Sequence, residues 1–409
     1  MSADTAMLTF AEGMKLVEHR CRATVGVELV ELREAGGRIL AEDIISPLGY
    51  PPADNSAVDG YAFDSEDVVL ANTGWLKVIG TSAAGHPFEC NIHRGEAVRI
   101  YTGALVPGGA NAVVMQEYVA LNRDFVSIPA ETRHAGNIRY ANEDVIKGAC
   151  VLNGGDFLGP ARIGLLASLG IAKIKVRRRI KVAIVSFGDE LQPAGELPQK
   201  GKIYESNRNA LRAMLETMGA IPVDYGIVPD VRDDVAAALR AAAEDNDAII
   251  STAGASVGDE DHVRNALKIV GGIDFAGLQM KPGRPMILGH VGSTPYFALP
   301  GNPVAALTCF ALIARIGLLH LAGATVRTPI RIPLPAKFSM SRKPGTLEFL
   351  RGMLEMGAQG PSVNLFPRSS TGSVSALAQC DGLIELEEGL TEIRPGMLLP
   401  FIPLGAVGL

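Results

Sequence analysis

The feature that most constrains this chain is an alternation of apolar runs and helical segments between Ile180 and Val270. Strand-length apolar runs occupy residues 180–186, 221–228 and 248–252, and helical patterns occupy residues 207–218, 231–244 and 261–270. Strands that are apolar on both faces and joined by helices form parallel sheets with helices on each face. The pattern therefore predicts a doubly wound α/β domain. Asn207 is expected to cap the first of these helices.

The remaining sequence predicts further domains, because 409 residues are too many for one core. Short β-like runs separated by Gly, Pro and Asn turns lie on both sides of the α/β pattern. We expect a multidomain fold of class α/β plus β, with an inserted small β domain and a C-terminal β domain. The predicted divisions are a discontinuous N-terminal domain (1–46 and 145–178), the inserted β domain (47–144), the α/β domain (179–328) and the C-terminal domain (329–409).

Composition and charge restrict the class of protein. Hydrophobic residues make up 47% and charged residues 20%, which indicates a folded globular chain. The net charge of −6 gives no basic footprint, so we expect neither nucleic acid nor a membrane as a partner. The apolar segment 304–324 contains Arg315 and His320, which favours a buried core helix over a membrane span.

The cysteines and the first residues indicate where the protein works. The five cysteines are scattered, without CxxC or Cys/His metal spacing, as in reduced cytoplasmic proteins. Cys309 lies in an apolar run and is expected to be an inert core thiol. The first twenty residues have no long apolar region, so no signal peptide is expected and the predicted location is cytoplasmic.

Four polar loops in the α/β domain are candidates for binding. They are residues 186–191, 251–261, 280–285 and 299–304. Ligands of doubly wound sheets collect at the carboxyl ends of strands, and Gly- and Ser-rich turns there expose backbone N–H groups to anions. Carboxylates such as Glu190 and Asp261 suit Mg²⁺ shared with ligand phosphates, while Lys281 and Arg284 supply positive charge.

Each of these loops, taken alone, is also explained as an ordinary turn with helix-start acids or a solvated cation. Four of them in one sheet domain favour a phosphate or oxyanion site. The sequence has no Walker loop, GxGxxG fingerprint, HExxH motif or GxSxG elbow, which argues against the corresponding enzyme classes.

One loop outside the α/β domain has an unusually specified composition. Residues 51–63 read PPADNSAVDGYAF. The two prolines enforce extended backbone, Asn and Asp side chains favour local hydrogen bonds, and Gly60 permits a turn. These features predict a stiff loop that presents the acid Asp59, with a structural and a functional interpretation equally open.

Seven motifs in order resemble the molybdopterin molybdenumtransferase family (MoeA and the E domain of gephyrin). They are PPADNSAVDGYAF, IYTGALVP, NIRYANEDV, VSFGDEL, TAGASVGDEDHV, MKPGRP and LPGNPVAAL. The resemblance covers nearly the whole chain. It implies an elongated homodimer with a MogA-like α/β domain and an active site at the subunit interface. It also implies an enzyme that hydrolyses adenylylated molybdopterin in a Mg²⁺-dependent step, releases AMP and inserts molybdate.

The resemblance assigns roles by motif position. Glu190 and Asp261 would organise the cation and molybdate, Lys281 would bind oxyanion, and Asp59 and Thr102 would reach the cleft from the other subunit. Pro300 and Pro303 would shape a loop wall, and Arg351 with Ser373 would contact molybdate. Further substrate-binding positions are Gly188, Gly254, Ser256, Gly258 and Arg284, together with Asp144 and Asp230, whose roles stay open. A MogA-like molybdopterin adenylyltransferase and cofactor-accepting enzymes are the expected partners.

The sequence departs from the family at three places. Gly277 stands where the family usually has a second lysine, Ala255 replaces the second glycine of a Gly pair, and residues 371–373 read Thr-Gly-Ser instead of Gln-Gly-Ser. The missing lysine removes one charge, for which Arg284 is a hypothetical substitute. Two alternatives therefore stay open: a non-catalytic scaffold of the gephyrin kind, and a MogA-like adenylyltransferase.

Overall fold

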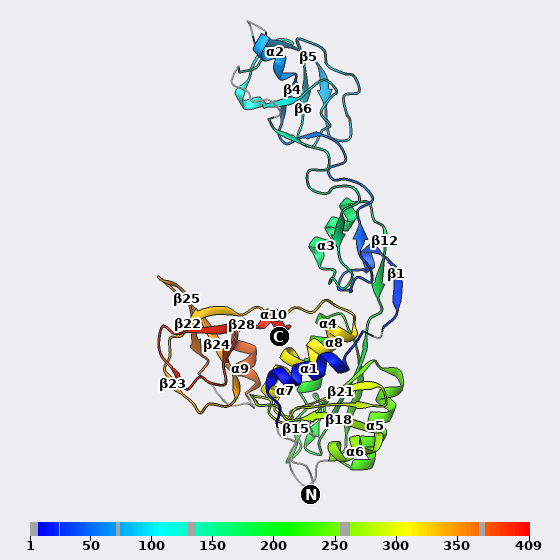
Figure 1. The fold of residues 1–409 in the computed structure, drawn as a ribbon, viewed down its shortest axis with the longest axis vertical. Coiled ribbons are helices and arrows are strands. Elements are labelled where there is room, and N and C mark those ends of the chain that lie inside the picture. Colours follow the sequence, from blue (N-terminus) through cyan, green and yellow to red (C-terminus); the bar gives the residue numbers. More distant parts are fainter. Residues whose placement is uncertain (1–6, 24, 71–73, 130–135, 254–261, 368–372) are drawn as a thin grey trace. The chain divides into compact units, whose positions relative to one another are not determined.

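The computed structural model describes residues 7–23, 25–70, 74–129, 136–253, 262–367 and 373–409 (Figure 1). The chain forms two compact units. Unit 1 comprises residues 1–42, 154–159 and 173–409, and unit 2 comprises residues 43–153 and 160–172. The four-domain boundaries expected from the sequence stay a prediction.

The centre of unit 1 is a six-stranded sheet in the order β16-β13-β17-β21-β20-β18. Its strands are β13 (Lys181–Phe187), β16 (Ile221–Val228), β17 (Ala248–Thr252), β18 (Gly271–Ala276), β20 (Ile287–Val291) and β21 (Thr294–Leu299). β16, β13 and β17 run parallel, as the apolar pattern predicted, and β21, which the pattern did not identify, extends the parallel part. β20 and β18 are antiparallel additions at one edge.

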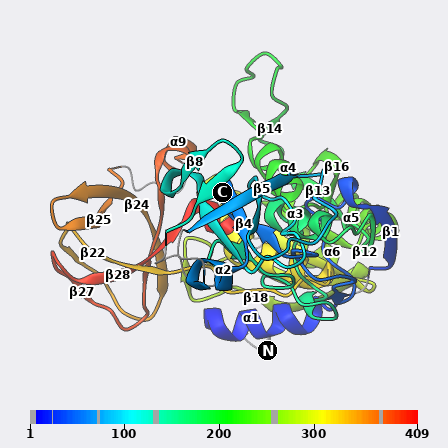
Figure 2. The ribbon, with the colours of Figure 1, turned by 90° about the horizontal axis from the view of Figure 1, so that it is seen from above.

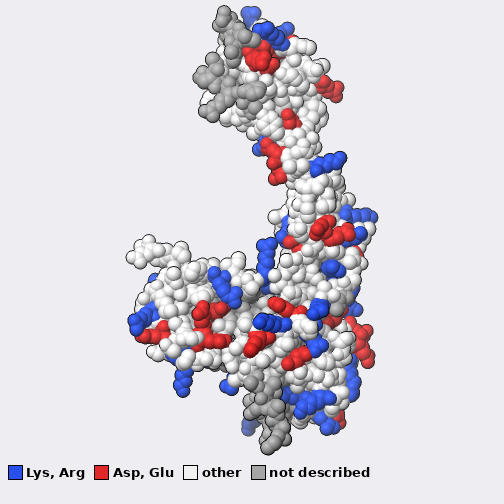
Figure 3. Space-filling model, in the orientation of Figure 1, with Lys and Arg blue, Asp and Glu red and all other residues white. Residues whose placement is uncertain are grey.

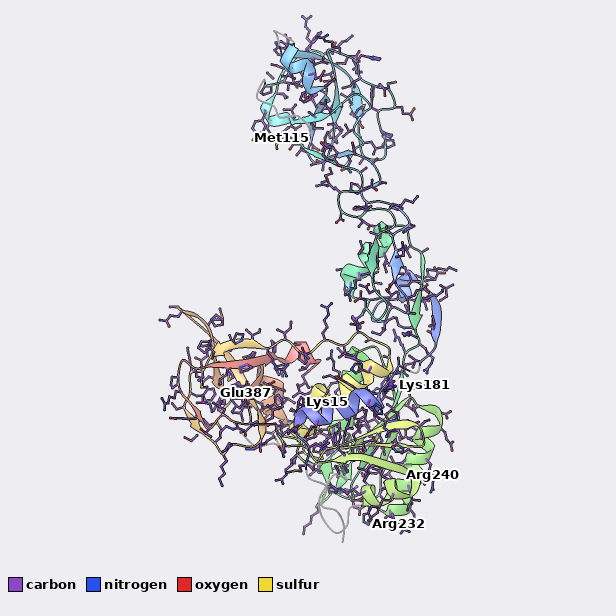
Figure 4. The ribbon with its side chains drawn as sticks, in the orientation of Figure 1. Lys15, Met115, Lys181, Arg232, Arg240 and Glu387 are labelled. Atoms are coloured by element: carbon purple, nitrogen blue, oxygen red, sulfur yellow. The ribbon has the colours of Figure 1, made fainter. Side chains whose placement is uncertain are left out.

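Helices cover both faces of this sheet. They are α1 (Phe10–Arg20), α4 (Asn207–Thr217), α5 (Arg232–Asp245), α6 (His262–Val270), α7 (Pro303–Cys309), the π-helical η3 (Phe310–Ala314) and α8 (Arg315–Leu321). Alternate side chains of β13 enter different cores. Val182 and Ile184 pack with α1, α4, α7, η3 and α8, whereas Ala183 and Val185 pack with α5 and α6. Arg232 and Arg240, labelled in Figure 4, lie on α5.

The expected core helix is present as the continuous run α7-η3-α8, Pro303–Leu321. Its length and composition would suit a membrane span, but 78% of its most apolar window is buried inside the protein. Cys309 and Phe310 are fully buried in the larger core. The run is therefore a core helix, as the sequence indicated.

The C-terminal strands form a second six-membered sheet in unit 1, seen as a separate group in Figure 2. Its order is β19-β24-β26-β28-β22, with β25 paired to β24. The strands are β19 (Met280–Lys281), β22 (Ile332–Pro335), β24 (Leu347–Gly357), β25 (Gly360–Leu365), β26 (Gly382–Leu386) and β28 (Leu398–Pro403). The edge strand β19 comes from the α/β segment of the chain, so this segment contributes one strand to the C-terminal sheet.

Smaller elements complete unit 1. They are β1 (Val27–Glu31) paired with β12 (Lys173–Arg177), η1 (Leu32–Glu34), β14 (Leu191–Gln192) paired with β15 (Ile203–Tyr204), β23 (Met340–Ser341) paired with β27 (Glu392–Ile393), α9 (Val374–Gln379) and α10 (Leu404–Val407). Basic and acidic side chains are interspersed on the face drawn in Figure 3.

Unit 2 is built on a six-stranded sheet in the order β7-β4-β6-β5-β9-β8. Its elements are β4 (Gly60–Phe63), β5 (Trp75–Ser82), β6 (Glu96–Ile100), β7 (Ala112–Met115), η2 (Gln116–Tyr118), β8 (Ala120–Asn122), β9 (Phe125–Ser127) and α2 (Ser65–Leu70). Two short strand pairs, β2 (Ile44–Ile45) with β11 (Cys150–Leu152) and β3 (Asn55–Ser56) with β10 (Ile138–Arg139), and helix α3 (Pro160–Ser168) belong to the same unit.

Candidate functional site

A cavity of about 650 Å³ lies at the carboxyl ends of the parallel strands β13, β17 and β21. Its lining comes from the ends of those strands and the loops after them, from β15 and the start of α4, and from single residues before β20 and at the start of α9: Glu190, Leu191, Ile203, Tyr204, Glu205, Ser206, Asn207, Thr252, Ala253, Pro285, Pro300, Gly301, Asn302, Pro303 and Val374. This is where doubly wound sheets bind ligands, and the volume suits a small organic molecule. We call it the strand-end cavity.

Glu190 reaches the strand-end cavity through a turn that requires glycine. β13 ends at Phe187, and Gly188 follows with φ +147°. A Cβ at Gly188 would lie 2.5 Å from Glu190 Oε2, so a larger residue would displace the carboxylate. Glu190 is exposed at the cavity wall, where it is accessible to a ligand.

The strand ends are tied together beside the cavity. The hydroxyls of Ser186 on β13 and Thr252 on β17 are 3.0 Å apart, and both side chains are buried. Ala253, which follows β17 and lines the cavity, has φ +67°. The predicted loop continues beyond it, but Gly254, Ser256, Gly258 and Asp261 lie outside the described residues.

Two buried polar residues at the start of α4 also line the cavity. Asn207 is 7% exposed and its Nδ2 donates to Gly301 O at 2.8 Å, which holds α4 against the loop after β21. Its Oδ1 has no hydrogen-bond partner among the described residues. Glu205 is 3% exposed, and its Oε1 accepts from Arg208 N at 2.9 Å. Its Oε2 lies 3.7 Å from Arg208 Nε.

These contacts correct one sequence expectation. Asn207 does not cap the helix: it is the first residue of α4, and Ser206 at the N-cap makes no side-chain cap bond. The Glu205 carboxylate accepts the free N–H of Arg208 instead. The polar triplet Glu205-Ser206-Asn207 was the available signal for these cavity residues, but such a triplet is equally typical of an ordinary helix start.

The loop wall expected from Pro300 and Pro303 is present. Both prolines line the strand-end cavity, with Gly301 and Asn302 between them. Pro303 occupies the first turn of α7, where a missing N–H costs nothing. The loop thus joins the end of β21 to a buried helix and is held from the other side by Asn207.

Two further cavities adjoin along the loop 280–285. One of about 310 Å³, the middle cavity, shares Pro285, Pro300 and Asn302 with the strand-end cavity. The other, of about 190 Å³, is lined by Arg351 and shares Lys281 and Pro282 with the middle cavity. We call it the Arg351 cavity. Shared wall residues thus link the strand-end cavity to the Arg351 cavity, and Lys281 stands between the last two.

Lys281 is paired in this structure. Its Nζ lies 2.8 Å from Glu348 Oε1, and the parallel pairing of β19 with β24 puts the two residues opposite each other. Arg351, three residues further along β24, is 8% exposed, and burial lowers the pKa of its guanidinium. The expected oxyanion-binding residues Lys281 and Arg351 therefore line one cavity.

Arg284 and Gly277 bear on the missing family lysine. Arg284 lines the middle cavity together with Lys281, and its Nε donates to Met7 Sδ at 3.1 Å. Gly277 has φ +101°, a conformation that side-chain-bearing residues rarely adopt, and a Cβ there would lie 3.3 Å from Met7 Cγ. The local backbone thus disfavours a lysine at this position.

Two predicted residues of unit 1 lie beside the cavities rather than in their linings. Ser373 is at the N-cap of α9, directly before the cavity residue Val374, and its hydroxyl lies 3.3 Å from that of Ser375. Asp230 follows β16, and its backbone N–H donates to Asp189 Oδ1 at 3.4 Å. The structure does not place either side chain in a described cavity wall.

Unit 2 contains the other three predicted residues. Oδ1 of Asp59 accepts hydrogen bonds from the N–H and the hydroxyl of Thr102, and these bonds lower the pKa of the carboxyl. Asp144 is exposed and its N–H donates to Tyr50 O at 3.0 Å. The resemblance implies that Asp59 and Thr102 reach the same cleft, and in the structure the two residues are hydrogen-bonded to each other.

The acids of the strand-end cavity bear on a magnesium site. Among the described residues, no three His, Cys, Asp or Glu side chains gather closely enough to hold a metal ion. Mg²⁺ is commonly held by one or two carboxylates together with substrate phosphates. Glu190 on the wall of the strand-end cavity fits that mode, with a ligand's phosphates as the remaining donors.

Comparisons with known proteins cover almost the whole chain. A family described as "MoeA N-terminal region (domain I and II)" matches residues 8–170, a "Probable molybdopterin binding domain" matches residues 183–320, and a "MoeA C-terminal region (domain IV)" matches residues 333–404. A protein of Haemophilus influenzae described as a molybdopterin molybdenumtransferase is 37% identical over 392 residues, covering 94% of this chain and 96% of the relative.

Two further relatives agree. "Molybdopterin molybdenumtransferase 2" of Mycobacterium tuberculosis is 34% identical over 404 residues, which cover 96% of this chain and 98% of the relative. The crystal structure of the molybdopterin biosynthesis moeA protein from Pyrococcus horikoshii OT3 is 29% identical with a TM-score of 0.82, covering 97% of this chain and 100% of that one. These matches confirm the expected α/β plus β multidomain fold and the family resemblance.

Proposed function

Because the chain belongs to the MoeA family of molybdopterin molybdenumtransferases, we propose that it inserts molybdate into adenylylated molybdopterin with release of AMP. It is a transferase of molybdenum cofactor biosynthesis. The finer steps, which involve the adenylate, the individual residues and the cation, are our proposal.

The observation that carries the proposal is the series of three adjoining cavities in unit 1. The strand-end cavity, of about 650 Å³, has the volume and polar lining for the pterin and its phosphates. The Arg351 cavity, of about 190 Å³, is lined by the cations Lys281 and Arg351 and the acid Glu348, so one positive charge is left in excess for a small anion. The middle cavity connects them through shared wall residues.

We assign roles to the chain's own residues accordingly. Asn207 and Gly301 fix the wall against which the ligand lies, and Pro300 and Pro303 shape it. Lys281 and Arg351 bind molybdate, and Arg284 adds charge from the middle cavity. One water adds across the anhydride P–O–P linkage of the adenylate, which yields AMP and the phosphorylated pterin.

Glu190 would hold Mg²⁺ together with the phosphates of the substrate. When bound, the ion neutralises charge that develops as the phosphoanhydride breaks. Asp261, the second acid expected in this role, lies outside the described residues. Through that shared cation, Glu190 would keep the ligand phosphates near the carboxyl end of β13.

We further propose that the active enzyme is a cytoplasmic homodimer. Asp59 and Thr102 of one subunit would complete the strand-end cavity of the other, and a MogA-like adenylyltransferase would supply the substrate. Support for this role of Asp59 comes from the two Thr102 donors, which orient its carboxylate and lower its pKa.

One assay tests this function against its alternatives. The protein is incubated with adenylylated molybdopterin, Mg²⁺ and molybdate, and AMP and molybdenum cofactor are measured. Release of AMP coupled to cofactor formation is expected. Absence of both products would indicate a scaffold, and synthesis of the adenylate from molybdopterin and ATP would indicate an adenylyltransferase.

A further inference from the structure

Glu348 lies between two positively charged side chains. Its Oε1 is 2.8 Å from Lys281 Nζ, and its Oε2 accepts from Arg342 Nε at 3.2 Å. The Glu348 side chain is only 6% exposed and lines the Arg351 cavity. Both carboxylate oxygens are thus used, one by a residue of the 280–285 loop and one by a residue of the C-terminal domain.

Arg342 fixes one side of this arrangement. Its side chain is 4% exposed, and it donates to the backbone carbonyls of Glu387, Leu390 and Thr346 in addition to Glu348. A guanidinium bonded on every side cannot follow a moving partner, and a buried cation requires its counter-charge. Arg342 therefore holds the Glu348 carboxylate in one position.

Of Lys281, Glu348 and Arg342, Lys281 has the most conformational freedom. Its side chain is 68% exposed, and a lysine on a flexible four-carbon stem loses considerable rotamer entropy when its ammonium is fixed. Because the bond to Glu348 is already present in the folded protein, the Lys281 ammonium is ordered before an anion binds. It holds the ammonium at the wall shared by the middle cavity and the Arg351 cavity.

We propose that Glu348 is a positioning residue for the oxyanion substrate: it orders Lys281 so that an anion entering the Arg351 cavity meets Lys281 and Arg351 together. The inference rests on the oxyanion role proposed above for Lys281. It adds a residue that does not itself bind the anion and that acts through Lys281.

Glu348 has two effects on molybdate binding, and they are opposite in sign. As an anion in the wall of the cavity it repels molybdate, so its neutralisation alone would tighten binding. As the partner of Lys281 it orders the cation, so its loss would weaken binding. Because Arg342 offsets the Glu348 charge at 3.2 Å, we expect the ordering effect to dominate.

The experiment measures the KM for molybdate and kcat in the AMP-release assay for the wild type, Lys281→Ala, Glu348→Gln and Glu348→Asp. The control is Glu355→Gln. Glu355 is on the same strand, and its Oε2 lies 2.9 Å from Lys337 Nζ, but neither residue lines a described cavity. We expect Glu348→Gln to raise the molybdate KM about tenfold with a smaller change in kcat. Glu348→Asp should recover part of the loss, and Glu355→Gln should match the wild type.

A second readout follows Lys281 directly. The rate of its acylation by an amine-reactive reagent, measured by peptide mass spectrometry on the folded enzyme, should rise in Glu348→Gln and stay unchanged in Glu355→Gln. This readout needs no turnover, and it reports on the ordering of the lysine.

The outcomes separate the two proposals. If Lys281→Ala leaves the molybdate KM unchanged, the oxyanion site itself is wrong. If Lys281→Ala raises KM but Glu348→Gln lowers it or leaves it unchanged, only the positioning role is overturned. Equal effects of Glu348→Gln and Glu355→Gln on KM and acylation would also overturn it.

Discussion

Oδ1 of Asp59 accepts two hydrogen bonds from one residue, the backbone N–H and the hydroxyl of Thr102, each at 2.8 Å. Both donors stabilise the carboxylate and lower its pKa from the usual 3.8, the backbone bond having the larger effect. Since the folded pKa is depressed, the linked stability is present above about pH 3.8 and is lost as the pH falls through the folded value.

Thr102→Val should therefore raise the pKa of Asp59 while leaving the backbone bond in place. The shift follows from the loss of the hydroxyl donor, and NMR titration of the Asp59 carboxyl measures it. Ser127→Ala, a change on β9 of the unit 2 sheet, is the control. An unchanged Asp59 pKa in Thr102→Val would contradict the assignment of the hydroxyl as a donor.

Glu190→Ala should reduce AMP release by about 100-fold or more while the fold stays intact, because the proposed cation loses its protein ligand. Circular dichroism and thermal unfolding check the fold, and AMP release checks the activity. Glu196→Ala, a change of another acid in the segment that follows β14, serves as the control. Near-normal turnover of Glu190→Ala would show that the cation assignment is wrong.

Asn207→Ala should raise the KM for the adenylylated substrate and lower stability by about 1 kcal/mol, because Gly301 O loses its donor and the cavity wall loosens. Asn209→Ala is a matched control, since Asn209 is on the same helix and exposed. Chemical denaturation measures the change in stability, and steady-state kinetics measure the change in KM. Equal KM values and equal stabilities of the two variants would show that Asn207 is not part of the binding site.

The position of the missing lysine can be tested from both sides. Gly277→Lys should destabilise the protein by about 1–3 kcal/mol, because a lysine would be strained at φ +101°.

Arg284→Ala should raise the molybdate KM if Arg284 supplies the charge that a family lysine usually provides. An unchanged molybdate dependence in Arg284→Ala would show that it does not compensate.

The proposed composite site predicts complementation between inactive variants. Asp59→Ala and Glu190→Ala should each be inactive alone. Mixed dimers should recover about a quarter to a half of wild-type activity, because one of the two sites in each heterodimer has both residues intact. Light scattering establishes the dimer and AMP release measures recovery. No recovery in mixed dimers of confirmed stoichiometry would place both residues in the same subunit's site.

The sequence predicted β13, β16 and β17 of the unit 1 sheet, because apolar runs such as Ala248–Thr252, which is buried throughout, alternate with amphipathic helices. It did not predict β18 and β20. These edge strands contain Gly271, Gly272, Gly289 and His290, which interrupt the apolar pattern that identifies a buried strand.

The positions of some site residues could likewise be predicted from the sequence, and those of others could not. Glu190 and Pro300 follow predicted or apolar strands, so their place at one sheet edge followed from topology. The pairing of Lys281 with Glu348 did not, because the two are far apart in sequence and β19 is only two residues long. Such a short strand leaves no periodic signal, and its partner is set by tertiary packing.

The hydrogen-bonded edge between β19 and β24 also has a consequence for dissecting this protein. One continuous core contains Leu299 and Phe310 from the α/β segment together with Phe349, Leu383 and Ile402 from the C-terminal strands. A gene fragment that stops before residue 333 would leave that apolar surface in water. The α/β segment and the C-terminal strands share one core, although family descriptions divide them, so we expect them to fold as one unit and to need expression together.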